Sequence, residues 1–274
     1  MSGPNEMERF QTELDSGGRR YRIVDLGAAA GADLARLPVV LRILLENVLR
    51  NGGGDSPGGV EAILGWLARG TSEAEIPFTP NRVLMHDTTC VPALVDIAAL
   101  RSAVAEAGGD PSRLNPVLPV DVSVDHSVAV DVFARPDAAA HNMERELARN
   151  AERYRFMKWA SSSLRGVRVH PPGTGIMHTI NLERLSSVIA QEKRDDAMSA
   201  FPDTLLGTDS HTPMVNGIGV LAWGVGGLEA ESVLFGMPAM LRIPDVVGVK
   251  LTGALRDGVL ATDLALTEIG RAHV

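Results

Sequence analysis

Apolar residues recur along this chain with two different periods. Residues 37–50 and 60–69 place apolar side chains three or four positions apart, which is typical of helices with one buried face. Residues 82–85 and 120–124 form short apolar or alternating runs, as strands do. The same patterns predict further helices at residues 95–107, 143–159 and 228–235, and further strands at residues 167–169, 204–206 and 246–251.

The order of these elements predicts the class of fold. Strands alternate with helices along the chain, and such alternation is typical of layered domains with a mainly parallel sheet. We therefore expect an α/β fold in which a mainly parallel sheet lies between two layers of helices. Residues 1–20 are mostly polar, and we expect them to form a loose N-terminal arm before an α/β core that occupies residues 21–267.

Composition narrows the class of protein. With 274 residues, 45% of them hydrophobic, the chain is long enough to bury a sizeable core. Its net charge of -8 argues against bulk affinity for nucleic acid or anionic membranes. The polar start and the lack of a long uncharged apolar stretch predict neither a signal peptide nor a membrane span. A single cysteine excludes an intrachain disulfide framework and favours a reducing cytoplasm.

The sequence Gly-Thr-Asp-Ser-His-Thr-Pro at residues 207–213 is the most prominent candidate site. Asp209, Ser210 and His211 follow a predicted buried strand and precede a glycine-rich segment, residues 216–227. Open α/β sheets bind ligands at the carboxyl ends of such strands. An Asp-Ser-His triplet also arises by chance, so its position at a strand end is what makes it a candidate.

The glycine-rich segment itself matches no nucleotide motif. A dinucleotide fingerprint needs Gly-x-Gly-x-x-Gly, and the run that starts at Gly224 has Glu229 in the last position. A phosphate-binding loop needs Gly-Lys followed by Ser or Thr, which the chain lacks. We expect these glycines to allow close packing around a substrate carboxylate.

Two further histidines stand at predicted strand or loop ends. Asp125 and His126 follow the alternating run at residues 120–124, and a carboxylate beside an imidazole can hold the ring in one tautomer, as a general acid requires. By itself this pair is more often structural. His178 ends a loop rich in proline and glycine, which lets the backbone approach a ligand but also suits an ordinary turn.

A fourth histidine, His86, follows the predicted strand at residues 82–85, with Asp87 beside it and Pro92 expected to open a helix. Four of the seven histidines, those at positions 86, 126, 178 and 211, therefore stand at strand or loop ends. This clustering favours one shared site over four separate structural histidines.

These residues belong to motifs that resemble the aconitase superfamily, in the branch of aconitase A and the iron-regulatory proteins. The resemblance covers residues 21–267 and is to the N-terminal part of that family. The motifs stand in the family's order, at residues 42–51, 75–78, 91–96, 125–131, 149–159, 175–178, 207–212 and 223–231.

The resemblance implies a hydro-lyase that isomerises citrate and isocitrate through cis-aconitate, with a four-iron four-sulfur cluster. It implies that Asp125 and His126 protonate the departing hydroxyl. It also implies that His178, Asp209 and His211 line the pocket and that Ser210 donates a hydrogen bond to a substrate carboxylate. The implied partner is a small polycarboxylate, and the intact protein is expected to be a cytoplasmic monomer.

Two departures from the family pattern leave alternatives open. His86 stands where this branch usually carries a substrate-contacting glutamine, so another hydroxyacid, such as 2-methylcitrate, homocitrate or a phosphonate analogue, remains an alternative substrate. The family's cluster takes three cysteine thiolates, whereas this chain has only Cys90, so we expect the ligand cysteines to lie outside it. A cluster-free, RNA-binding form is a further alternative, which the acidic charge disfavours.

The last seven residues, 268–274, read Glu-Ile-Gly-Arg-Ala-His-Val. They match the in-frame translation of a common sequencing adapter, at the point where the family pattern breaks. We therefore expect a non-native tail on an incomplete core, and a fragment that is inactive alone.

Overall fold

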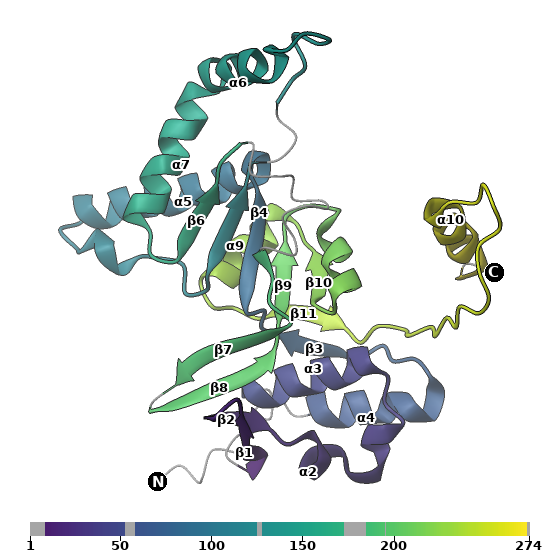
Figure 1. The fold of residues 1–274 in the computed structure, drawn as a ribbon. Helices are drawn as coiled ribbons and strands as arrows, with labels where there is room; N and C mark the ends of the chain where they lie inside the picture. The colour runs from purple at the N-terminus through teal and green to yellow at the C-terminus, as the bar shows by residue number, and fades with distance from the viewer. Residues whose placement is uncertain (1–8, 53–57, 125–127, 173–184, 195, 273–274) are drawn as a thin grey trace.

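The computed structural model describes residues 9–52, 58–124, 128–172, 185–194 and 196–272. Its centre is a sheet of five parallel strands in the order β10-β9-β4-β5-β6 (Figure 1). The α/β prediction with a mainly parallel sheet is confirmed. The strands are β4 (Arg82–His86), β5 (Val120–Ser123), β6 (Val167–His170), β9 (Thr204–Gly207) and β10 (Leu221–Gly224).

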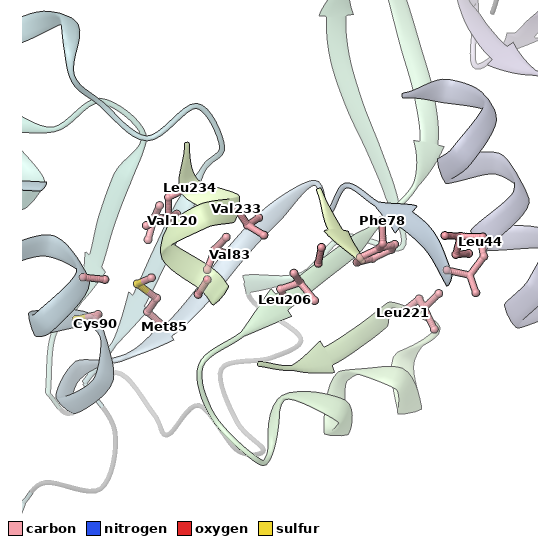
Figure 2. Packing of buried hydrophobic residues seen from close by; sticks show 14 of the residues in the cluster. Leu44, Phe78, Val83, Met85, Cys90, Val120, Leu206, Leu221, Val233 and Leu234 are labelled. Atoms are coloured by element: carbon pink, nitrogen blue, oxygen red, sulfur yellow. The ribbon is translucent and has the colours of Figure 1, made fainter. Parts of the chain in front are cut away.

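One face of this sheet is apolar and covered by helices. Helix α5 (Asp87–Glu106) connects β4 to β5. Helices α6 (Ala138–Arg149) and α7 (Ala151–Ser163) come between β5 and β6 in the sequence. Helix α9 (Gly227–Leu234) follows β10. Buried strand side chains pack against α5 and α9. Figure 2 shows Val83, Met85 and Val120 of the strands near Cys90 of α5 and near Val233 and Leu234 of α9. Burial of these apolar side chains favours folding.

The opposite face carries polar side chains at alternate positions. Asp121 and Ser123 on β5 are buried there, next to His86 on β4. Toward β9 and β10 this face becomes apolar again, where Leu84, Leu205 and other residues form a small cluster under the short helix η4 (Thr212–Ile218). A strand that is apolar on one side and polar on the other gives the alternating pattern seen in the sequence.

A second layer lies beside the parallel sheet. Helices α2 (Leu26–Ala30), α3 (Val39–Arg50) and α4 (Gly59–Arg69) pack near a four-stranded sheet of β1 (Gln11–Ser16), β2 (Arg19–Val24), β8 (Ala197–Pro202) and β7 (Ile189–Arg194). A two-stranded sheet joins β3 (Glu75–Phe78) to β11 (Ala239–Arg242). Short helices η1 (Gly31–Ala35) and η3 (Pro111–Arg113) complete the turns, and α10 (Ala261–Ala272) stands apart in Figure 1.

Four expectations about local structure were wrong. Residues expected in the loose arm form β1, which pairs with β2. The helix expected to open at Pro92 begins at Asp87, because His86 caps it, and Pro92 lies inside it. Residues 143–159 are divided between α6 and α7. No strand forms at residues 246–251, where Val247, Val249 and Leu251 are exposed and unpaired with any described strand.

Helix α5 is, among the described residues, the one helix long and apolar enough in composition to cross a membrane. In the structure it is the crossover helix of the parallel sheet and contacts β4, β5, α7 and α9. Five of its twenty residues are buried, so packing within the described fold accounts for part of its apolar character.

Candidate active site at the carboxyl ends of β4 and β9

The five-stranded sheet has a topological switch point between β4 and β9. From β4 the chain moves outward to β5 and β6, whereas β9 and β10 extend the sheet on the other side of β4. Loops that leave the carboxyl ends of two such strands turn in opposite directions, which opens a crevice where α/β proteins bind ligands. His86 ends β4, and Thr208 and Asp209 follow β9 directly. The switch point thus brings together two of the predicted sites.

Hydrogen bonds join the two loops at this point. The Thr208 backbone N–H donates to the Leu84 carbonyl at 3.0 Å. The Thr208 hydroxyl lies 2.6 Å from the Thr89 hydroxyl and accepts from the His86 backbone N–H at 3.4 Å. These contacts fix the loop after β9 against the first turn of α5. Sequence reasoning assigned no role to Thr89 or Thr208.

Asp209 orders His211 within the second loop. The Asp209 Oδ1 atom accepts a hydrogen bond from the His211 backbone N–H at 2.7 Å and lies 2.9 Å from the ring Nδ1. The Ser210 hydroxyl is 3.5 Å from the same ring nitrogen. The Asp209 side chain is 14% exposed, whereas the imidazole is 52% exposed. A mostly buried carboxylate therefore holds an accessible imidazole, an arrangement suited to acid–base chemistry.

Two glycines allow this loop to pack closely. A Cβ atom at Gly207 would overlap the side chain of Thr212, and one at Gly224 would lie 3.0 Å from the Asp209 carbonyl oxygen. By contrast, Gly217, Gly226 and Gly227 have no neighbouring atom within 4 Å of an added Cβ. Close contact with the loop that holds Asp209 thus explains Gly224 at the end of β10. That Gly217, Gly226 and Gly227 pack around a substrate stays a prediction.

His86 has a structural contact as well as a place at the site. Its side chain is 5% exposed, and its Nδ1 atom accepts from the Thr88 backbone N–H at 3.2 Å, which caps α5. The same nitrogen is 2.6 Å from the Thr88 hydroxyl and 3.4 Å from Asp87 Oδ1. A histidine cap at this position fixes the imidazole at the edge of the crevice. Its role in substrate choice stays a prediction.

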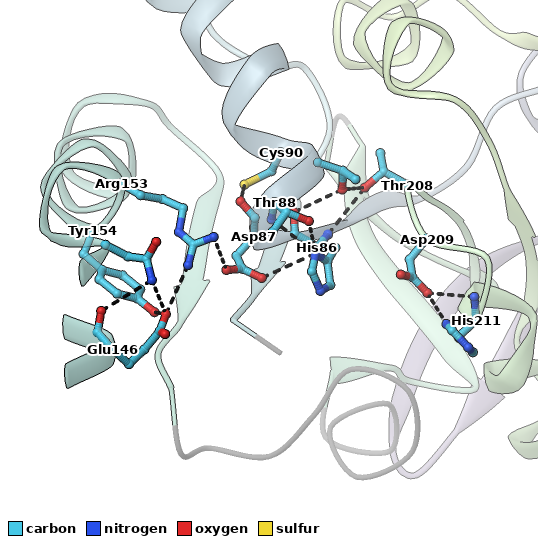
Figure 3. A network of polar contacts seen from close by, with 12 residues as sticks. His86, Asp87, Thr88, Cys90, Glu146, Arg153, Tyr154, Thr208, Asp209 and His211 are labelled. Carbon is cyan, nitrogen blue, oxygen red and sulfur yellow. Dashed lines mark hydrogen bonds and ion pairs between the residues drawn. The ribbon is translucent and has the colours of Figure 1, made fainter. Parts of the chain in front are cut away.

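A chain of buried charges leads away from this edge (Figure 3). Asp87 Oδ2 lies 3.2 Å from Arg153 Nη1, and Arg153 Nη2 lies 3.1 Å from Glu146 Oε1. The Tyr154 hydroxyl at 2.7 Å and the Asn150 amide at 2.8 Å also donate to Glu146 Oε1. Burial, with Glu146 beside it, raises the pKa of Tyr154. These contacts tie α6 and α7 to the start of α5.

Charged residues on a helix usually form a solvated face. Glu146 and Arg153 do not, since their side chains are 0% and 18% exposed. Glu146 lies on α6 and Arg153 on α7, so their pairing depends on how the two helices meet and not on one continuous helical face. Their link to Asp87 has no signal in the sequence, because it joins residues far apart along the chain.

Another buried carboxylate, Asp121, lies on the polar face of the sheet. Burial would raise the pKa of Asp121, but hydrogen bonds from His170 and Arg168 outweigh that effect and hold it below its usual value. His170 Nε2 is 3.0 Å from Asp121 Oδ1, and Arg168 Nη2 is 2.8 Å from Asp121 Oδ2. Parallel pairing of β5 and β6 places these residues side by side.

The described residues do not fit an iron–sulfur cluster. Cys90 is buried and its thiol donates weakly to the Asp87 carbonyl at 3.5 Å. Burial, with Asp87 nearby, raises the pKa of Cys90 to about 12, whereas a cluster ligand must be a thiolate. Within the described ranges no group of three or more His, Cys, Asp or Glu side chains could hold a metal ion. Asp125, His126 and His178 lie outside the described residues.

Comparison with known proteins agrees with this architecture. The sequence pattern of the Aconitase family (aconitate hydratase) matches residues 61–274. The chain is similar to Aconitate hydratase A of Pseudomonas aeruginosa, with 51% identity over 254 residues, which is 91% of this chain and 28% of the relative. Aconitate hydratase A of Escherichia coli is 50% identical over 249 residues, which is 90% of this chain and 28% of the relative. Aconitate hydratase A of Thermus thermophilus is 48% identical over 257 residues, which is 92% of this chain and 28% of the relative. The chain thus spans about 28% of the length of these relatives. Because the match covers well over half of the chain, the chain belongs to the aconitase family.

Proposed function

We propose that this chain is the N-terminal part of an aconitate hydratase, which interconverts citrate and isocitrate through cis-aconitate. The observation that carries the proposal is the switch point between β4 and β9, where the loop that holds an accessible imidazole against a carboxylate is joined to His86 through Thr208. The printed names of the relatives, each about half identical to this chain, support the same activity. The intact protein would act on a small polycarboxylate, as a monomer in the cytoplasm.

Each predicted site residue has a part in this proposal. His126, with Asp125 ordering its ring, would give a proton to the departing hydroxyl. Asp209 would hold His211 in place beside the substrate, together with His178, and the exposed Ser210 hydroxyl would donate to a substrate carboxylate. Cysteines outside this chain would hold the four-iron four-sulfur cluster, since Cys90 is buried and protonated.

The proposal is tested with the full-length protein that carries this sequence, purified and reconstituted without oxygen. Formation of cis-aconitate from citrate and from isocitrate is followed by its ultraviolet absorbance. Turnover of both acids is the expected result. Turnover of 2-methylcitrate, homocitrate or a phosphonate analogue without turnover of citrate would instead support the alternative that His86 suggests. Inactivity on every acid of the panel would contradict both.

A variant of His126 tests the assignment of the acid. His126→Asn should lower kcat by ~10²- to 10⁴-fold, as loss of a general acid does, with a much smaller change in KM. His86→Gln is the companion variant for substrate choice, and we expect it to shift the ratio of kcat/KM values toward citrate. A kcat within a few fold of the parent would assign the acid role to another residue.

A further inference from the structure

A polar cavity lies at the end of the five-stranded sheet opposite the candidate site. Its volume is about 300 Å³, at the lower end of the range for small-molecule sites. Arg82, the first residue of β4, and Pro119, which precedes β5, line its wall at the amino ends of the strands. Gln191 of β7 and Phe201 of β8 close the other side.

Positive charge predominates among the side chains that line this cavity, although the whole chain carries a net charge of -8. Four arginines face two carboxylates, and the remaining polar residues are amides and hydroxyls. The arginines are Arg50, Arg82, Arg168 and Arg194, and the acids are Glu192 and Asp203.

The two inner arginines are held in place by buried partners. Arg50 bonds to Glu46 at 2.8 Å, and its guanidinium stacks over the Phe201 ring at 3.9 Å from the centroid. Arg82 bonds to Asp203 and to a backbone carbonyl, and its Nε is buried without a hydrogen-bond partner among the described residues. These side chains form a fixed floor, in which Glu46 and Asp203 balance the charges of the two guanidinium groups.

The two outer arginines have donors to spare. Arg168 uses Nη2 for Asp121 at 2.8 Å, and its side chain is 62% exposed. Arg194 uses Nε for Glu192 at 2.7 Å and Nη1 for the Arg50 carbonyl at 3.5 Å, and its side chain is 38% exposed. A guanidinium carries five N–H donors in a fixed fork, so each of these side chains can bind a second oxyanion. Glu192 is 51% exposed and can turn to solvent when an anion arrives.

We propose that this cavity binds a small polyanion that carries phosphate or carboxylate groups, held at the rim by Arg168 and Arg194. Planar guanidinium groups suit both kinds of oxyanion because they can donate two parallel hydrogen bonds. Asp121 and Glu192 compete for the same guanidinium groups, so binding is weaker than at an unpaired arginine cluster. The site is separate from the crevice between β4 and β9 and does not depend on the proposed function.

The test is calorimetric titration of the full-length protein that carries this sequence with two probes, pyrophosphate and tricarballylate. Arg168→Gln and Arg194→Gln should each weaken binding of a responding probe about tenfold, because each removes a charge-assisted hydrogen bond. Arg145→Gln is the matched control, since Arg145 is 53% exposed on α6 and lies outside the cavity. It should leave the affinity unchanged.

The two probes also distinguish the ligand. A response by pyrophosphate alone indicates a phosphate compound, a response by tricarballylate alone indicates a polycarboxylate, and a response by both indicates recognition of charge. Absence of binding by either probe would overturn the proposal. So would binding that both Gln variants leave unchanged, because the probe would then occupy another site, including the crevice. Melting temperatures of the variants report whether the fold is retained, and should Arg168→Gln fail to fold, Arg194→Gln carries the test alone.

Discussion

Arg153 is the cation between two buried carboxylates, and its removal gives the largest stability change that we predict. In an Arg153→Gln variant, Asp87 and Glu146 lose their shared cationic partner in surroundings where their side chains are 0% exposed. Breaking a buried ion pair by removing one partner costs about 3–5 kcal/mol. Glu146 retains its hydrogen bonds from Tyr154 and Asn150, which places the expected loss at the lower end, about 3 kcal/mol.

Hydrogen exchange measured by mass spectrometry reports this loss where it occurs. A local loss of about 3 kcal/mol increases exchange in α7 and at the start of α5 by roughly a hundredfold or more, since ~1.4 kcal/mol is tenfold. Arg145→Gln is the control on α6, because its ion pair with Asp131 is 3.5 Å long and exposed, and such pairs contribute under about 1 kcal/mol. Equal exchange in the two variants would refute the reasoning about burial.

Three further predictions concern single residues. Gly207→Ala should lower the melting temperature and the free energy of unfolding, by about 1–3 kcal/mol, because the new methyl group would lie 2.6 Å from Thr212 Cγ2. The control variant Gly217→Ala should leave the melting temperature unchanged, since no atom lies within 4 Å of the added Cβ. Asp121→Asn should lower the free energy of unfolding near neutral pH. The difference between variant and parent should shrink as pH falls below ~4, because the lowered pKa of Asp121 means that the charged carboxylate stabilises the fold only above that range. A difference in urea unfolding that does not change with pH would contradict this. Cys90 should resist alkylation by iodoacetamide until the protein unfolds, since its pKa is raised to about 12, and rapid labelling of the native protein would show that it is accessible.

Local patterns predicted most of the parallel sheet and its helices. The apolar face of each strand and the helical spacing in α3, α4 and α9 follow directly from burial, which periodicity records. The strand predicted at residues 246–251 does not form, and its apolar residues Val247, Val249 and Leu251 are exposed. Its apolar pattern suits a strand, but a strand also needs a neighbour, and no described strand lies beside it.

The site was predictable only in part. Asp209 and His211 stand two residues apart, so their contact is local, and a strand-end position could be inferred from the preceding apolar run. The bond between Thr89 and Thr208 joins residues 119 apart in sequence, and no local pattern predicts it. Long-range pairs of this kind depend on the order of the strands in the sheet, which a single sequence does not specify.

The most direct test of the site is the turnover of an Asp209→Asn variant of the full-length protein at saturating isocitrate. Asp209 holds the His211 ring at 2.9 Å, and the amide of asparagine would present a donor in place of a carboxylate oxygen. We expect kcat to fall at least ~100-fold, in the range for a disabled acid–base group, while the melting temperature stays close to that of the parent. A kcat within a few fold of the parent would contradict the assignment of the crevice between β4 and β9 as the catalytic site.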